Sequence, residues 1–110
     1  MNKHGHFFQD AASGLPDEIV ETLLTGRDVR IERIVSNGQA SPPGHWYDQD
    51  EDEWVMLLEG AATLRFESGN DLLQMTPGMH LHIPAHARHR VEWTAPGRRS
   101  LWLAVFYRAA

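Results

Sequence analysis

Short apolar runs, broken by turn residues, dominate the chain from Val29 onward. Val29 to Ile34 alternates apolar with charged residues, and so does Thr63 to Glu67, which is typical of a strand with one face toward a core and one toward water. Trp54 to Leu58 and Leu101 to Phe106 are apolar on both faces, so they predict strands whose two faces are both covered. Turn residues separate these runs at fairly even intervals, which favours an all-β sandwich or barrel.

The pattern predicts a short helix followed by strands. Pro16 to Leu24 opens with proline and acidic residues, spaces its apolar residues at helical intervals and stops before Gly26, as a helix does. Met1 to Leu15 has no periodicity and is expected to be an extended arm. We therefore divide the chain into an arm with a helix at 1–28 and a barrel at 29–110. The expected strands are Val29 to Ser36, Trp54 to Glu59, Ala61 to Glu67, Asp71 to Met75, His80 to Ile83, His89 to Thr94 and Ser100 to Arg108.

Length and composition limit the classes of protein to consider. A chain of 110 residues with 42% apolar residues has room for one core of ordinary size. No apolar run approaches the roughly 18 residues that span a bilayer, so no membrane partner is expected. The first residues carry no apolar stretch after Lys3, which predicts a protein without a secretory signal and a cytoplasmic location.

Charge and cysteine content remove further classes. The formal net charge is −5 and the basic residues are scattered, which argues against nucleic acid as a partner. The chain has no cysteine, so disulfides, thiolate metal sites and cysteine nucleophiles are excluded. It also lacks a glycine-rich phosphate loop after a strand and the Gly-X-Ser-X-Gly turn of serine hydrolases. Any metal must be held by nitrogen and oxygen ligands.

Two motifs carry the chemistry. A loop rich in proline and acidic residues leads into Glu53, an apolar strand and Gly60. About thirty residues on, Pro77-Gly78 precedes a strand that ends in Ile83-Pro84, and His89 follows. Together these motifs resemble the paired motifs of the cupin superfamily, over roughly Val29 to Phe106. Trp46-Tyr47-Asp48-Gln49 is similar to a run found in small single-domain bacterial cupins.

The resemblance implies a jelly-roll-like barrel, the cupin double-stranded β-helix, with one divalent metal ion inside. The family's first motif has two His separated by one residue before its Glu. Counted back from Glu53, those positions fall on Trp46 and Asp48 or on Tyr47 and Gln49, and neither pair is His-X-His. His45 lies just upstream.

From this resemblance we expect His45, Asp48, Glu53 and His89 as metal ligands. Imidazole and carboxylate groups suit iron, manganese, zinc or nickel in sites of four to six ligands. Glu53 heads an otherwise apolar strand, where a buried carboxylate without a partner would be costly. It is therefore the candidate catalytic acid or base.

Other side chains could contact a ligand. Trp46 is expected at the pocket mouth, and the hydroxyl of Tyr47 could orient a ligand. His80 and His82 share one strand face, but the pattern leaves open which face looks inward, and it leaves the role of His86 open as well.

Three functions remain compatible with the sequence. The first is a metal-dependent enzyme acting on a small organic molecule. The second is a metal-free module that binds a small ligand such as a sugar or an aromatic acid. The third is a structural barrel filled by its own side chains. The apolar faces of Leu101 to Phe106 further suggest that two barrels pair as a homodimer.

Overall fold

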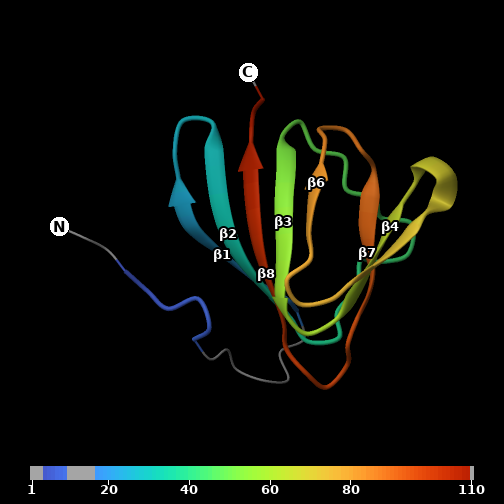
Figure 1. Ribbon diagram of the computed structural model, residues 1–110. Coiled ribbons are helices and arrows are strands. Elements are labelled where there is room, and N and C mark those ends of the chain that lie inside the picture. Colours follow the sequence, from blue (N-terminus) through green and yellow to red (C-terminus); the bar gives the residue numbers. More distant parts are fainter. Residues whose placement is uncertain (1–3, 10–16, 110) are drawn as a thin grey trace.

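Two antiparallel sheets facing each other make up the computed structural model, which describes residues 4–9 and 17–109 (Figure 1). The larger sheet has five strands in the order β1-β2-β8-β3-β6, and the smaller has three in the order β5-β4-β7. This confirms the all-β, jelly-roll-like architecture. The elements are β1 (Ile19–Thr25), β2 (Val29–Ser36), β3 (Asp52–Glu59), β4 (Ala62–Phe66), a 3-10 turn (Ser68–Asn70), β5 (Leu72–Met75), β6 (His80–Ile83), β7 (His89–Thr94) and β8 (Ser100–Tyr107).

The expected helix at Pro16 to Leu24 is wrong. Pro16 lies outside the described residues, and Ile19–Thr25 forms strand β1, which pairs antiparallel with β2 from Ile19 opposite Val35 onward. A helix of this length gains little in water, whereas an extended segment satisfies the backbone groups along the free edge of β2. The segment is also rich in β-branched residues, which suit a strand. The described part of the chain contains no helix long and apolar enough to span a membrane.

The core lies between the sheets, where alternate residues of each strand point inward. Val55, Leu57, Trp102, Ala104 and Phe106 come from the larger sheet. They meet Ala62, Leu64 and Met75 of the smaller sheet. The register follows the apolar pattern because a slip by one residue would turn this whole set toward solvent.

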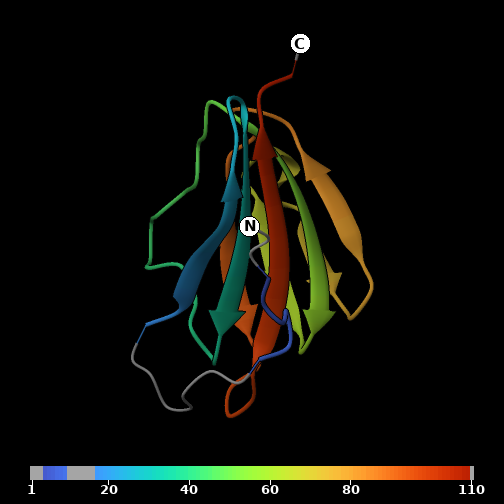
Figure 2. The ribbon, with the colours of Figure 1, turned by 90° about the vertical axis from the view of Figure 1, so that its left-hand side faces the viewer.

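The N-terminal arm is held against the outer face of the larger sheet. Figure 2 shows residues 4–9 (dark blue) crossing in front of β8. The guanidinium of Arg33, almost completely buried, donates to the carbonyl oxygens of Phe7 at 2.7 Å and Gln9 at 2.6 Å and pairs with Glu21. A buried guanidinium needs such partners, so the arm and β1 supply what Arg33 requires.

Candidate functional site

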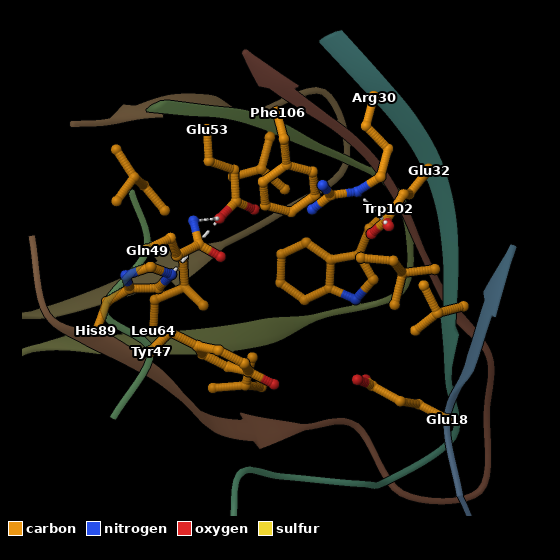
Figure 3. Close-up of a pocket in the computed structure, with 15 residues that line it drawn as sticks. Glu18, Arg30, Glu32, Tyr47, Gln49, Glu53, Leu64, His89, Trp102 and Phe106 are labelled. Atoms are coloured by element: carbon orange, nitrogen blue, oxygen red, sulfur yellow. Dashed lines mark hydrogen bonds and ion pairs between the residues drawn. The ribbon is translucent and has the colours of Figure 1, made fainter. Parts of the chain in front are cut away.

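A cavity of about 240 Å³ opens between the two sheets (Figure 3). Most of its wall is apolar, and the polar groups gather at two ends. One end holds Glu53, His89, Tyr47 and Gln49, and the other holds Glu18, Arg30 and Glu32. The apolar lining is Val20, Ile34, Val55, Leu64, Ile83, Val91, Trp102 and Phe106.

Glu53 and His89 meet at the first end. Glu53 lies on β3 and His89 begins β7, so the two side chains come from opposite sheets. The Oε1 atom of Glu53 is 3.6 Å from the Nε2 atom of His89, which makes the contact an ion pair when the ring is protonated. Only 8% of Glu53 and 5% of His89 is exposed. Charge at this site is therefore poorly screened by water.

The hydrogen bonds of His89 fix which of its nitrogens carries a proton. Its Nδ1 atom lies 2.8 Å from the carbonyl oxygen of Ala87, which can only accept, so Nδ1 must donate. The Nε2 atom then faces Glu53, and a second proton makes the ring an imidazolium. Burial opposes that charge, but the attraction of Glu53 and the bond to Ala87 outweigh it and raise the pKa of His89. The pair thus holds a proton at the edge of the cavity.

The long loop before β3 runs along β7 and forms backbone hydrogen bonds with it, as an additional strand would. The backbone of Tyr47 donates to the carbonyl of His89 at 2.7 Å and accepts from its N–H at 3.2 Å. Further along, the carbonyl of Gln49 accepts from the N–H of His86, and the N–H of Ser41 donates to the carbonyl of Val91. Because side chains two residues apart on an extended segment point the same way, this pairing turns both Tyr47 and Gln49 into the cavity.

Tyr47 and Gln49 place neutral polar groups beside the pair formed by Glu53 and His89. The amide nitrogen of Gln49 donates to Oε1 of Glu53 at 3.2 Å. The ring of Tyr47 lies 5.6 Å from that of His89. Burial, together with the charges of Glu18 and Glu53, raises the pKa of Tyr47, so its hydroxyl stays a hydrogen-bond donor.

The opposite end of the cavity is acidic. Among the described residues that line this end, Arg30 is the one cation. The Nε atom of Arg30 donates to Glu32 at 2.8 Å, and its Nη1 atom donates to Glu51 at 3.1 Å. The guanidinium also stacks over the ring of Phe106, 4.3 Å from the ring centre. Two carboxylates therefore balance the charge of Arg30 before any ligand arrives.

Glu18 is the less satisfied carboxylate at this end. The residue is exposed to solvent, and its carboxylate receives one hydrogen bond, from the hydroxyl of Ser36 at 3.2 Å. Partial burial of the carboxyl raises its pKa. No ion pair engages it within the part of the chain that the structure describes. In Figure 3 its carboxylate points into the cavity, on the side of Trp102 and the hydroxyl of Tyr47.

The structure brings together only part of the metal set expected from the sequence. Glu53 and His89 are adjacent, whereas His45 and Asp48 are exposed and do not line the cavity. Asp48 instead pairs with His86 at 2.8 Å. Tyr47 lines the cavity as expected of a ligand contact, but Trp46, which was expected at its mouth, is not among the lining residues.

The remaining histidines of the second motif face outward. His80 and His82 are exposed on β6, where His80 stacks on Trp54 and His82 pairs with Asp52 at 2.9 Å. The inward positions of β6 are taken by Leu81 and Ile83. Strand alternation thus excludes both histidines from the cavity.

The donor set fits a divalent ion poorly. In the described residues no three His, Asp or Glu side chains gather as metal ligands would. Around Glu53 and His89 stand a neutral amide, Gln49, and a protonated phenol, Tyr47, which are weak ligands for the metals in question. Catalytic sites hold such an ion with three protein ligands of the imidazole or carboxylate kind, and this end of the cavity offers two, Glu53 and His89.

Sequence reasoning missed several residues of the cavity. The pattern placed Glu18 in a helix, Trp102 in a strand covered on both faces, and Arg30 in a strand with one face toward water. Arg30, Glu32 and Ile34 alternate on β2, so they share one face, but the charged members gave no reason to place that face inward. Gln49 belongs to one of the two pairs of positions on which the family's His residues fall, and its spacing from Glu53 was the available signal.

Comparison with known proteins relates the chain to one family. A family model described as a cupin domain matches residues 32–106. Among solved structures, a protein from Ralstonia eutropha JMP134, described provisionally as a mannose-6-phosphate isomerase, is 52% identical with a TM-score of 0.93. That match covers 98% of this chain and 100% of the other. No curated protein matches the chain.

More distant structures share the fold. A cupin superfamily protein from Desulfitobacterium hafniense DCB-2 is 18% identical with a TM-score of 0.73, and the match covers 90% of this chain and 84% of the other. An RmlC-like cupin from Methanocaldococcus jannaschii is 16% identical with a TM-score of 0.69, over 90% and 87% of the two chains. These similarities support the double-stranded β-helix architecture.

Proposed function

This chain belongs to the cupin family, and we propose that it is a metal-independent member that binds a small organic molecule between its sheets and exchanges a proton with it. The contact between the buried side chains of Glu53 and His89 in a mostly apolar cavity is the observation that carries this proposal. General acid and base catalysis requires a proton donor and a proton acceptor positioned within hydrogen-bond reach of the reacting group.

Each polar group at this end has a distinct role. The Nε2–H of a protonated His89 donates a proton to a polar atom of the ligand, and the carboxylate of Glu53 accepts one. The amide of Gln49 keeps Glu53 in position through its 3.2 Å hydrogen bond. The hydroxyl of Tyr47 is a further donor that orients the ligand.

The relative from Ralstonia eutropha supports proton transfer as the chemistry. Its description names an isomerase, and moving a hydrogen within a sugar requires groups that accept and donate protons. We carry over this general chemistry and leave the sugar phosphate aside, because the charges at the second end of the cavity do not favour it.

The first experiment follows proton exchange directly. Small molecules that raise the melting temperature of the protein are incubated with it in D₂O, and deuterium entering carbon-bound positions is measured by mass spectrometry. The wild type and Glu67→Gln, which changes an exposed carboxylate outside the cavity, should both catalyse exchange. Glu53→Gln and His89→Gln should slow it at least about a hundredfold. Undiminished exchange in either cavity variant would refute the proposal.

The second experiment addresses the metal-dependent enzyme that cupin membership also suggests. Protein purified without a histidine tag is analysed for iron, manganese, zinc and nickel. We expect metal well below one ion per chain. One ion per chain that disappears in both Glu53→Ala and His89→Ala would instead establish the metal-dependent alternative.

We also propose that two barrels pair through the outer face of the larger sheet. That face carries apolar side chains that remain partly exposed, and such surfaces commonly mark contacts with another protein. The partly exposed apolar side chains of this face are Ile31, Trp54, Met56, Leu103, Val105 and Tyr107.

Cytoplasmic location stays a prediction.

A further inference from the structure

The charges of the cavity restrict the class of ligand that it can take. Two cations line it, and each already faces a carboxylate: Arg30 is paired with Glu32 and Glu51, and His89 with Glu53. The described residues include no α-helix, so no helix N-terminus offers amide donors to an anion. A phosphate or carboxylate would enter beside acidic groups without a cation of its own.

The carboxylate of Glu18, in contrast, favours a ligand with a positive charge. Glu18 projects into the cavity and has a single hydrogen-bond donor, Ser36. Partial burial of its carboxyl raises its pKa, and the hydrogen bond from Ser36 offsets only part of that rise. An ammonium group is the ligand group that would pair with this carboxylate, by a charge-assisted hydrogen bond where Glu18 both lines the cavity and is exposed to solvent.

The volume and the lining of the cavity restrict the size and the chemistry of the rest of the ligand. An engineered cavity of about 150 Å³ holds benzene, so 240 Å³ takes about one ring with a short chain. Trp102 and Phe106 present aromatic rings, and Leu64 and Val91 add aliphatic surface. Such a wall stabilises an apolar body, and the ring of Trp102 also favours a neighbouring positive charge, whereas the ring of Phe106 already contacts Arg30.

We propose that the ligand of this cavity is a small organic cation, an amine about one ring in size, whose ammonium group binds the carboxylate of Glu18. The rest of the molecule lies against Trp102 and Phe106 and reaches toward Glu53 and His89. This proposal rests on the proposed function of the cavity and names its ligand class. It disfavours both the sugar phosphate of the relative's description and the aromatic acid that the sequence allowed.

Calorimetric titration with three probes tests the proposal. The probes are 2-phenylethylamine, its anionic counterpart 3-phenylpropionate, and mannose 6-phosphate. We expect 2-phenylethylamine to bind the wild type more tightly than either anion. Glu18→Gln removes the charge but keeps the shape, and should weaken binding of the amine by about tenfold to a hundredfold. Glu67→Gln, the matched surface control, should leave its affinity unchanged.

Each contrary outcome has a defined meaning. Tighter binding of either anion, or an amine affinity that Glu18→Gln does not change, would overturn the assignment. Failure of all three probes to bind would overturn it as well. Because proton exchange by Glu53 and His89 is measured separately on molecules found by thermal shift, the proposed function could survive any of these results.

Discussion

The carboxylate of Glu53 and the imidazole of His89 approach to 3.6 Å from opposite sheets. Neither strand alone holds this pair in place, because each side chain owes its direction to a different sheet. The rings of Tyr47 and Phe66, centred 5.6 Å and 6.0 Å from that of His89, flank the imidazole. The pair therefore exists only in the folded barrel, and its proton is coupled to folding.

We expect the pKa of His89 to fall when Glu53 is replaced by Gln. Because the folded state raises this pKa, it binds the proton more tightly than the unfolded state. The resulting stability is present below the ordinary pKa of about 6.5 and is lost as the pH rises through the raised value. Ring signals of His89 followed by NMR from about pH 5 to about pH 9 measure the shift, and urea unfolding over the same range measures the stability. An unchanged titration in Glu53→Gln would contradict this coupling.

Adding two imidazoles should create a metal site. Tyr47 and Gln49 line the cavity beside Glu53 and His89, so Tyr47→His with Gln49→His would bring four strong ligands together. We expect the double variant to bind Zn²⁺ or Ni²⁺ with one ion per chain and to gain thermal stability on binding. The matched control adds His89→Ala to the double variant and should bind at least about tenfold more weakly. Equal binding by the wild type would show that its own donors suffice.

Gly60 should tolerate no side chain. Its φ is +92°, and a Cβ would lie 2.6 Å from Cα of Ser100 and 2.7 Å from the carbonyl oxygen of Arg99. Gly60→Ala should therefore cost about 3 kcal/mol or more, combining backbone strain with overpacking. Gly97 is the control, since its φ is +73° but nothing lies near its Cβ. Gly97→Ala should cost about 1 to 2 kcal/mol. Urea unfolding compares the two, and equal losses would show that the contact at Ser100 can relax.

A charge on the outer face should separate the proposed dimer. Val105 lies at a partly exposed position of β8, whose neighbours point into the core. We expect sedimentation to give a dimer for the wild type and a monomer for Val105→Arg, because an unpaired charge is costly in an apolar contact. Trp93→Arg, at an exposed aromatic residue of the smaller sheet, is the control and should remain dimeric. A monomeric wild type would exclude pairing through this face.

The sequence by itself determined most of the strands and the two motifs. Alternation is a local property, so the strands β2, β6 and β7 begin and end where the pattern predicts, and the ends of β3, β4, β5 and β8 differ by one or two residues. The motif around Glu53 and the motif around His89 could also be identified from the sequence, because each consists of a turn and a strand that are continuous in the chain.

Only the tertiary structure decided which side chains share the cavity. Ile19–Thr25 carries a weak local preference, and pairing with the edge of β2 made it a strand that brings Glu18 to the pocket. The loop at Tyr47 has no periodicity, and its pairing with His89 turned Tyr47 and Gln49 inward while Asp48 faces solvent. Such choices depend on partners distant in the chain, and no local pattern encodes them.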